Sequence, residues 1–323
     1  MHRPTVGDTG VKTSLEQGAP SYETAVGVTA LTANTTGIYN SAFGAGALSH
    51  NATGSSNTAV GCASNVTNTS GSGNTAVGAF ALSTTGNNNT AVGADAYTGG
   101  SSSLPSTGNN NSCLGAAAFY ALQAGSENSA LGTSALHRLT SGSDNVGVGF
   151  GALSAVTQGS LNTAVGAYAG LSVSGVGTGH VMIGYGAGAF PGAAAHATTT
   201  AANQTLLGTE TGNASGAQPD NVTAVGYQAL VDGHYATAIG STTLAGAAGA
   251  VAIGCDSTGA GASTTTLNEI KLGTTRHTAN IPGALRVGNG VGLWGHATPA
   301  TQPATPASLA DVIAVLQGYG LTA

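Results

Sequence analysis

The chain has 323 residues, of which 53 are glycine, and only 6% are charged and 5% aromatic. A globular domain normally contains about 25% charged residues, so this composition is not that of an ordinary globular protein. The formal net charge is −6 with only six Lys and Arg residues, which leaves no basic surface for nucleic acid. A positive mean hydropathy argues against disorder and favours an ordered, nearly neutral rod.

Residues 1–22 contain no repeat and are rich in charge for this chain, with Arg3, Asp8, Lys12 and Glu16. We predict either an attachment segment that docks onto a larger particle, or a flexible tail or cap for the first coil of the structure that follows. The segment has no apolar stretch of a secretory signal. The chain has no run of about 20 apolar residues, so no membrane insertion is expected.

From residue 23 to residue 258 the chain repeats one motif, seen in full at Asn57–Gly61 as Asn-Thr-Ala-Val-Gly. Copies aligned on the last glycine, here called the signature glycine, are most often 17 residues apart, and the last two steps are 14. A fixed period of this size predicts a solenoid. The signature glycines are residues 27, 44, 61, 78, 93, 115, 132, 149, 166, 184, 208, 226, 240 and 254.

The residue before each signature glycine is Val, Leu, Ile or Phe, and the residue two positions earlier is mostly Thr or Ser. Side chains two apart share one face of a strand. We therefore predict that the aliphatic residue lies in the core and that the small Ala between them faces another surface closely. The predicted core residues are Val26, Phe43, Val60, Val77, Val92, Leu114, Leu131, Val148, Val165, Ile183, Leu207, Val225, Ile239 and Ile253.

Other positions of the repeat predict the rest of the coil. An Ala-Leu pair, as in Ala47-Leu48, follows three residues after the signature glycine and indicates a second short strand or turn. Ten copies have a Gly seven residues before the signature glycine, which predicts a recurring turn. Two insertions, Tyr97–Ser106 and Phe190–Gln204, break the period, and we expect lateral protrusions there that either contact a ligand or are plain surface loops.

Sites for metal or catalysis are not expected. Cys62, Cys113 and Cys255 are dispersed and are predicted to be small buried apolar residues. The eight histidines are scattered, and only His277 and His296 are candidates for an axial ion shared by three chains. The carboxylates are too isolated to pair as in a glycosidase. The sequence therefore predicts a protein that is not an enzyme and has no cofactor.

After residue 258 the character of the chain changes. Leu267–Gly273 alternates apolar and charged residues, as a strand does, and a Pro-rich stretch over 298–306 favours an extended segment. A short amphipathic helix is predicted to begin at Ser308 and to stop at Gly318. We interpret 259–323 as a trimerisation and tip domain. Its candidate ligand-binding residues are Arg276, Trp294 and His296, although for Trp294 packing in the core of a trimer is the favoured alternative.

The 14-residue copies at Ala236–Gly240 and Ala250–Gly254 resemble the head repeats of trimeric autotransporter adhesins. The 17-residue form, with Ala-Leu after the glycine, resembles repeats of bacteriophage tail fibres, and the C-terminal part resembles the ends of phage tail and head fibres. These resemblances imply an all-β fold: a homotrimeric, left-handed parallel β-roll, or β-solenoid, closed by intertwined β-strands and a short terminal helix. The repeat itself does not specify the biological role.

The resulting hypothesis is a homotrimeric virion fibre on the surface of a bacteriophage particle. Its N-terminus would bind other virion proteins, and its C-terminal domain would attach to a host surface polysaccharide or other glycan. Three alternatives remain open at this stage. They are a thin monomeric solenoid, a cellular adhesin or surface filament of the same coil, and an ice-binding solenoid with a flat, exposed Thr face.

Overall fold

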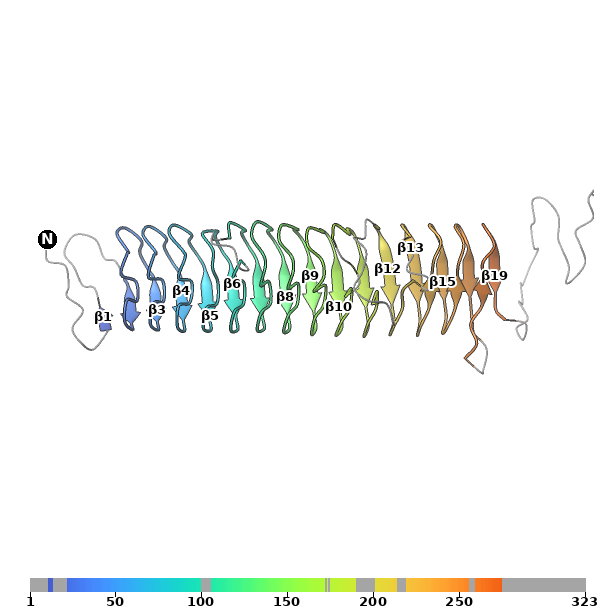
Figure 1. The fold of residues 1–323 in the computed structure, drawn as a ribbon, viewed down its shortest axis with the longest axis horizontal. Helices are drawn as coiled ribbons and strands as arrows, with labels where there is room; N and C mark the ends of the chain where they lie inside the picture. Colours follow the sequence, from blue (N-terminus) through green and yellow to red (C-terminus); the bar gives the residue numbers. More distant parts are fainter. Residues whose placement is uncertain are drawn as a thin grey trace, which may run out of the picture. The chain divides into compact units, whose positions relative to one another are not determined.

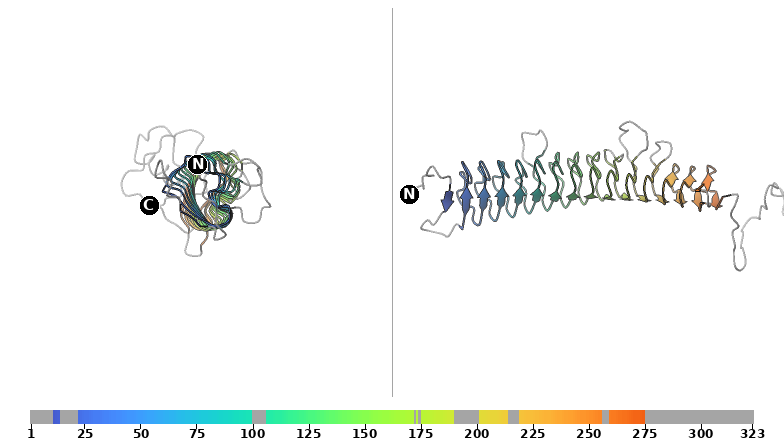
Figure 2. Two further views of the ribbon diagram at one scale, coloured as in Figure 1. Left: turned by 90° about the vertical axis from the view of Figure 1, so that its left-hand side faces the viewer. Right: turned by 90° about the horizontal axis from the view of Figure 1, so that it is seen from below.

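A computed structural model describes residues 11–13, 22–99, 106–171, 173, 175–189, 201–213, 219–255 and 259–274. The described residues form a parallel β-solenoid, in agreement with the period of the sequence. Its strands lie side by side in one row (Figure 1), and seen along the row the coils superimpose on a common outline (Figure 2). In this part of the chain, no helix has the length and apolar character needed to cross a bilayer.

One sheet of 16 strands runs through all the coils. Apart from β1, its strands are parallel and pair residue for residue, so that Thr58, Ala59 and Val60 align with Thr75, Ala76 and Val77. The strands are β1 (Val11–Thr13), β2 (Thr24–Val26), β3 (Ser41–Phe43), β4 (Thr58–Val60), β5 (Thr75–Val77), β6 (Thr90–Val92), β7 (Ser112–Leu114), β8 (Ser129–Leu131), β9 (Val146–Val148), β10 (Thr163–Val165), β11 (Val181–Ile183), β12 (Gln204–Leu207), β13 (Val222–Val225), β15 (Thr237–Ile239), β17 (Val251–Ile253) and β19 (Ile270–Leu272).

The first strand acts as a cap. β1 pairs with β2 in the antiparallel sense, with Val11 opposite Val26 and Thr13 opposite Thr24. An uncovered first coil would present a row of unpaired backbone groups on which another chain could pair. The pairing of β1 with β2 is compatible with the cap predicted within residues 1–22, and the attachment segment stays a prediction.

The prediction of which residues face the core was wrong. In the three-residue strands from β2 to β17 the middle residue is buried and its two neighbours are partly or fully exposed, as in β4, where Ala59 is buried and Val60 is 38% exposed. All fourteen aliphatic residues assigned to the core lie in this outer column: Val26, Phe43, Val60, Val77, Val92, Leu114, Leu131, Val148, Val165, Ile183, Leu207, Val225, Ile239 and Ile253. The reason is space, because the coil interior opposite the strand is already occupied.

The Ala-Leu pair fills that space. Ala47 and Leu48 are both buried, and the same positions hold Ala135 and Leu136 in a later coil. A Cβ added to Gly147, which occupies the middle position of its strand, would lie 3.2 Å from Leu136 Cδ1. With a leucine across the coil, the facing strand position accepts little more than a methyl group.

A second short strand or a turn was predicted at the Ala-Leu pair, and the described coils contain both, with strands only near the C-terminal end. β14 (Leu230–Val231), β16 (Leu244–Ala245) and β18 (Ser263–Thr264) form a small parallel sheet. These strands belong to the shorter, 14-residue coils and to the coil after them. In the 17-residue coils the Ala-Leu pair lies in turns, and Leu48 and Leu136 have positive φ angles of 50° and 51°.

A buried column of asparagines four residues before the signature glycine ties the coils together. Each backbone N–H of this column donates to the side-chain oxygen of the preceding one, as from Asn57 to Asn40 and from Asn74 to Asn57, both at 3.0 Å. Each Nδ2 donates to the carbonyl of a turn glycine, as from Asn57 to Gly71 at 2.9 Å. The column consists of Asn40, Asn57, Asn74, Asn89, Asn111, Asn128, Asn145 and Asn162.

The solenoid extends past residue 258, where the repeat was predicted to end. β19 pairs in parallel with β17, with Lys271 opposite Ala252, so the strand predicted at Leu267–Gly273 is a further coil of the stack. Tyr97, predicted to open a protruding insertion, is instead buried, and its ring packs edge-on against Phe119 at 5.8 Å. Burial raises the pKa of the Tyr97 hydroxyl to about 12.

Asn65 is a weak point of the core that one substitution should repair. It occupies the place that Leu48 and Leu82 occupy in the adjacent coils, it is fully buried, and neither polar atom of its side chain has a hydrogen-bond partner. Asn65→Leu should stabilise the protein by about 1–2 kcal/mol, because it removes two unpaired polar groups and adds apolar contacts. Thermal unfolding should shift upward by about 2–4 °C for each kcal/mol gained.

A buried asparagine with partners supplies the matched control. Asn68 Nδ2 donates to Asn51 Oδ1 and to the Gly71 carbonyl, both at 2.9 Å, and Asn68 Oδ1 accepts from Gly71 N–H at 2.8 Å. Asn68→Leu should therefore lower the melting temperature. Equal shifts in the two variants would contradict the assignment of Asn65 as an unsatisfied position.

Candidate interaction surface

The outer face of the long sheet carries two parallel columns of side chains. One is the aliphatic column before the signature glycine, in which Phe43 is 41% and Leu114 is 52% exposed. The other is the Thr and Ser column two residues earlier, with Thr58 aligned on Thr75 and Thr75 on Thr90. Both columns follow the strand register from β2 to β13. The aliphatic column is continuous there, whereas Val146 and Val181 interrupt the Thr and Ser column.

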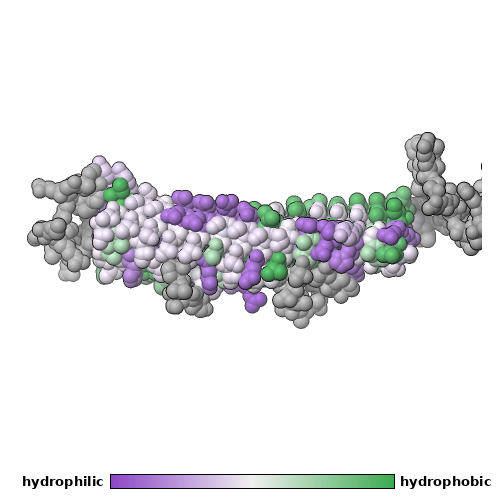
Figure 3. Space-filling model, turned by 90° about the horizontal axis from the view of Figure 1, so that it is seen from above, coloured by the Kyte–Doolittle hydropathy of each residue, from purple (hydrophilic) through white to green (hydrophobic). Residues whose placement is uncertain are grey.

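A continuous exposed aliphatic column of this length is unusual for a chain that acts alone. Single exposed apolar residues are normal on soluble proteins, but long contiguous patches mark interaction surfaces. Figure 3 shows hydrophobic side chains in a regular row along one edge of the C-terminal half of the described solenoid. The outer sheet face is therefore the strongest candidate interaction surface of the described residues.

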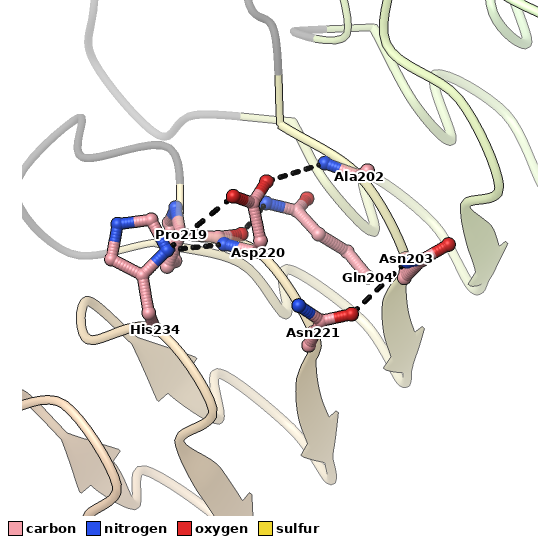
Figure 4. A network of polar contacts seen from close by, with 7 residues as sticks. All are labelled: Ala202, Asn203, Gln204, Pro219, Asp220, Asn221 and His234. Atoms are coloured by element: carbon pink, nitrogen blue, oxygen red, sulfur yellow. Dashed lines mark hydrogen bonds and ion pairs between the residues drawn. The ribbon is translucent and has the colours of Figure 1, made fainter.

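A polar network fixes the chain beside the second insertion (Figure 4). Asp220 Oδ1 accepts a hydrogen bond from the Ala202 N–H at 2.8 Å, and His234 Nδ1 accepts one from the Asp220 N–H at 3.0 Å. His234 Nδ1 also lies 3.6 Å from Asp220 Oδ2. Together these contacts join the turns of three successive coils. We therefore assign the network a structural role.

His180 interrupts the asparagine column and is the buried titratable group of this region. Its N–H donates to Asn162 Oδ1 at 3.0 Å, as an asparagine would, and its Nδ1 accepts from Gln204 N–H at 3.4 Å. Burial lowers the pKa of the His180 ring to about 4, against smaller upward contributions from the Ala201 backbone and the Asp220 carboxylate. The ring is therefore neutral in the folded protein at neutral pH.

His180 should make the protein less stable in mild acid. Below a pH of about 6.5 the unfolded chain takes up a proton that the folded ring binds only near pH 4, so stability falls across this window and levels off below it. The loss amounts to about 3 kcal/mol for a shift of this size. His180→Asn, which continues the asparagine column, should flatten the stability profile between pH 6.5 and 4, as measured by chemical denaturation.

The control for this prediction is an exposed histidine. His50 lies on the surface, and His50→Asn shows the effect of losing one histidine without a change in the buried column. A His180→Asn variant that keeps the wild-type slope would show that other groups cause the acid sensitivity.

Some of the remaining predicted site residues lie outside the described part of the chain, and the cysteines differ in their burial. Arg276, Trp294 and His296 lie outside the described residues, as do His277, the Pro-rich stretch and the C-terminal helix. Cys113 is buried as predicted, and burial raises its pKa to about 12, but Cys62 is exposed and its prediction was wrong. No group of three or more His, Cys, Asp or Glu side chains within the described ranges could hold a metal ion.

Sequence comparison adds no relatives. The chain matches no family model and no curated protein. Its function therefore has to be argued from the repeat and from the surface that the repeat builds.

Proposed function

We propose that the protein is a homotrimeric, non-enzymatic fibre on the surface of a bacteriophage particle, which attaches to a glycan of the host cell surface. The observation that carries the proposal is the unbroken aliphatic column on the outer face of the long sheet. A coil whose interior holds mainly Ala, Leu and Asn has a narrow core. Three copies that pack their aliphatic columns around a common axis would give the fibre a second, wider core.

The resemblance of the repeats to trimeric adhesin heads and phage tail fibres supports three copies. The regular sheet suits a spacer, because each coil adds about 4.8 Å of length and the chain contains few charged side chains. The proposal assigns residues 1–22 to contacts with other virion proteins, with β1 also capping the first coil. It assigns the residues after the last described coil to trimer closure and to the ligand, through Arg276, Trp294 and His296.

Two measurements test the proposal. Mass photometry of the purified chain should give a species near three times the chain mass of 30.7 kDa, and a stable monomer would refute the trimer. Antibody labelling of intact phage in electron micrographs should then place the protein on the particle. Labelling of a cell surface instead would favour a cellular adhesin.

The location of the host-binding residues needs its own comparison. One variant replaces Arg276, Trp294 and His296 with Ala, and two others each lack one insertion, residues 98–106 or 191–203. With each trimer shown intact, only the triple substitution should abolish binding to host cells. Binding that survives it, but is lost with either insertion, would move the receptor site to the side of the shaft.

Ice binding is a second candidate that one observation favours. The Thr column lies on the outer face of a regular sheet, as an ice-binding face requires, with Thr58, Thr75 and Thr90 in register. The same face cannot both be covered in a trimer and order water. A thermal-hysteresis assay on the purified protein therefore decides between them, and we expect no activity.

A further inference from the structure

A third outer column, directly after the signature glycine, carries large aromatic rings in the middle of the shaft. Phe150, Tyr185 and Tyr227 are 49%, 55% and 52% exposed, respectively. The two coils between them hold Ala167 and Thr209 at the same position. An aromatic ring therefore recurs in every second coil, with a smaller residue between successive rings.

Backbone hydrogen bonds show that these residues form one column. In each coil the second residue after the signature glycine donates its N–H to the carbonyl of the first residue after that glycine in the preceding coil. Since the bonding is unbroken over five coils, successive rings stand two coils, or roughly 9.6 Å, apart. The bonds run from Tyr168 to Phe150 at 2.8 Å, from Gly186 to Ala167 at 3.0 Å, from Glu210 to Tyr185 at 2.9 Å, from Gln228 to Thr209 at 3.0 Å and from Thr242 to Tyr227 at 2.8 Å.

Tyr168 holds two of these rings in place. Its ring meets Phe150 at a centroid distance of 5.2 Å and an angle of 80°, and meets Tyr185 at 6.2 Å and 87°. Such edge-to-face pairs are favourable arrangements for aromatic side chains. Tyr168 thus separates Phe150 from Tyr185 and fixes both planes nearly perpendicular to its own, which leaves the two rings partly exposed yet ordered.

Polar groups accompany the rings. Gln228 Nε2 donates to Glu210 Oε2 at 2.7 Å, and these two residues belong to the coils of Thr209 and Tyr227. A carboxylate has several lone pairs and an amide has both donors and an acceptor, so this pair retains capacity for further hydrogen bonds. The column therefore combines ordered apolar platforms with partners for hydroxyl groups.

The aromatic column is distinct from the surface proposed to join the three chains. In the first seven coils the same position is mostly small, as at Ala45, Ala79, Ala94 and Ala116. A contact between chains that runs along the whole shaft needs a continuous column, and the aliphatic column before the glycine supplies it. Rings confined to five coils indicate a local site.

We infer that Phe150, Tyr185 and Tyr227, with Glu210 and Gln228, form a binding site for an extended, β-1,4-linked polysaccharide lying along the shaft. In such a chain every second sugar presents the same face, and the repeat of two sugars has a length comparable with two coils. Aromatic rings stack on the apolar faces of sugars, while the Glu210–Gln228 pair bonds their hydroxyls. This inference rests on the proposed glycan-binding function and adds a site on the shaft to the predicted one at the C-terminus.

The test is isothermal titration calorimetry of the full chain with cellohexaose and chitohexaose, and with the corresponding disaccharides. We expect at least one hexasaccharide to bind, and to bind more tightly than its disaccharide, because it reaches more than one ring. The α-1,4-linked maltohexaose, whose chain is curved, should not bind. Tyr185→Ala, which removes the middle ring, should weaken hexasaccharide binding about tenfold.

Tyr235 provides a matched control, since it is 69% exposed and lies in the turn before β15, outside this column. Tyr235→Ala should bind as the wild type does. Absence of binding to both β-linked hexasaccharides, or equal affinity in Tyr185→Ala, overturns the inference. So does loss of the oligomer in Tyr185→Ala by mass photometry, because the column would then be a chain contact.

The experiments can refute the proposed shaft site and the proposed fibre function independently of each other. Host-cell binding that depends on Arg276, Trp294 and His296, together with no hexasaccharide binding, overturns the shaft site and leaves the proposed fibre intact. Hexasaccharide binding by a protein that proves to be a monomer supports the site and refutes the trimeric fibre.

Discussion

Ala76→Asp is expected to unfold the solenoid locally, whereas Val77→Asp, one residue further along β5, should leave each chain folded and separate the subunits of the proposed trimer. Ala76 is fully buried between Ala59 and Ala91 of the adjacent strands. A carboxylate there would be unpaired in a dry interior, at a cost of about 4–5 kcal/mol or more. Val77 lies in the outer aliphatic column, where Asp remains hydrated in the single chain.

Circular dichroism and mass photometry distinguish the two effects. Ala76→Asp should lose the circular dichroism signal of the sheet and melt at a lower temperature. Val77→Asp should retain that signal and have the mass of a monomer in mass photometry. Val77→Ala, which shortens the side chain without adding a charge, should weaken the trimer less. A Val77→Asp protein that stays trimeric would show that the aliphatic column is not the surface that joins the chains.

The repeat made the fold predictable, and the width of the coil explains why the orientation of the strands was not. Alternation in Thr58-Ala59-Val60 allows either face to be inside, and hydrophobicity alone favours Val60. The deciding quantity is the volume across the coil, which the Leu of the Ala-Leu pair already fills. That volume depends on which residue lies across the coil, and the pattern along a single strand does not contain this information.

The sequence did contain a sign of this packing. Where Leu is replaced by Gly170, and in the next coil by Gly188, the strand position that is usually Ala holds Met182. A Cβ on Gly170 would lie 3.4 Å from Met182 Sδ, so the large residue fills the space that the glycines leave. Large and small residues therefore exchange between the two positions, as they do when two side chains share one space.

The asparagine column was also visible in the sequence but was not predicted as a buried feature. Asn is common in turns because it tolerates positive φ and bonds its own backbone. Here Asn57 has an ordinary φ, points inward and bonds the next coil. Its recurrence four residues before the signature glycine, at a fixed place next to a strand, was the available signal.

The interaction surfaces depend on relations between coils. That Phe150, Tyr185 and Tyr227 share a column follows from aligning the copies, but their exposure and the role of Tyr168 follow only from the register of the turns. The candidate residues Arg276, Trp294 and His296 lie beyond the repeat, so neither the period nor the described coils place them.

A single methyl group is expected to have a large effect at Gly61. Its φ angle is +129°, and an added Cβ would lie 2.5 Å from the carbonyl oxygen and 2.6 Å from the carbonyl carbon of Gly78 in the next coil. The obstacle is backbone, so the stack itself would have to open. Gly61→Ala should therefore cost at least about 3 kcal/mol, and the damage should spread, because each coil is stabilised mainly by its neighbours.

Substitutions at three other glycines distinguish the overlap of an added Cβ with the next coil from the strain of a positive φ angle. Gly71 has no unusual φ, but a Cβ there would overlap the Gly86 carbonyl oxygen, whereas Gly46 has a φ of +72° and its nearest atom would be 3.7 Å away. Gly212 has neither constraint, since its nearest atom would be 3.9 Å away. We expect Gly71→Ala to be nearly as damaging as Gly61→Ala, Gly46→Ala to cost about 1 kcal/mol, and Gly212→Ala to be close to neutral.

Thermal unfolding of the four variants tests the stacking directly. If close backbone contact between coils controls stability, the order of melting temperatures should be Gly212→Ala, Gly46→Ala, Gly71→Ala and Gly61→Ala, from highest to lowest. A Gly71→Ala protein as stable as Gly212→Ala would mean that the coils can move apart to admit a methyl group. The carbonyl to which Asn57 Nδ2 donates at 2.9 Å is that of Gly71, so the same variant also tests whether the asparagine column holds the turn glycines at this spacing.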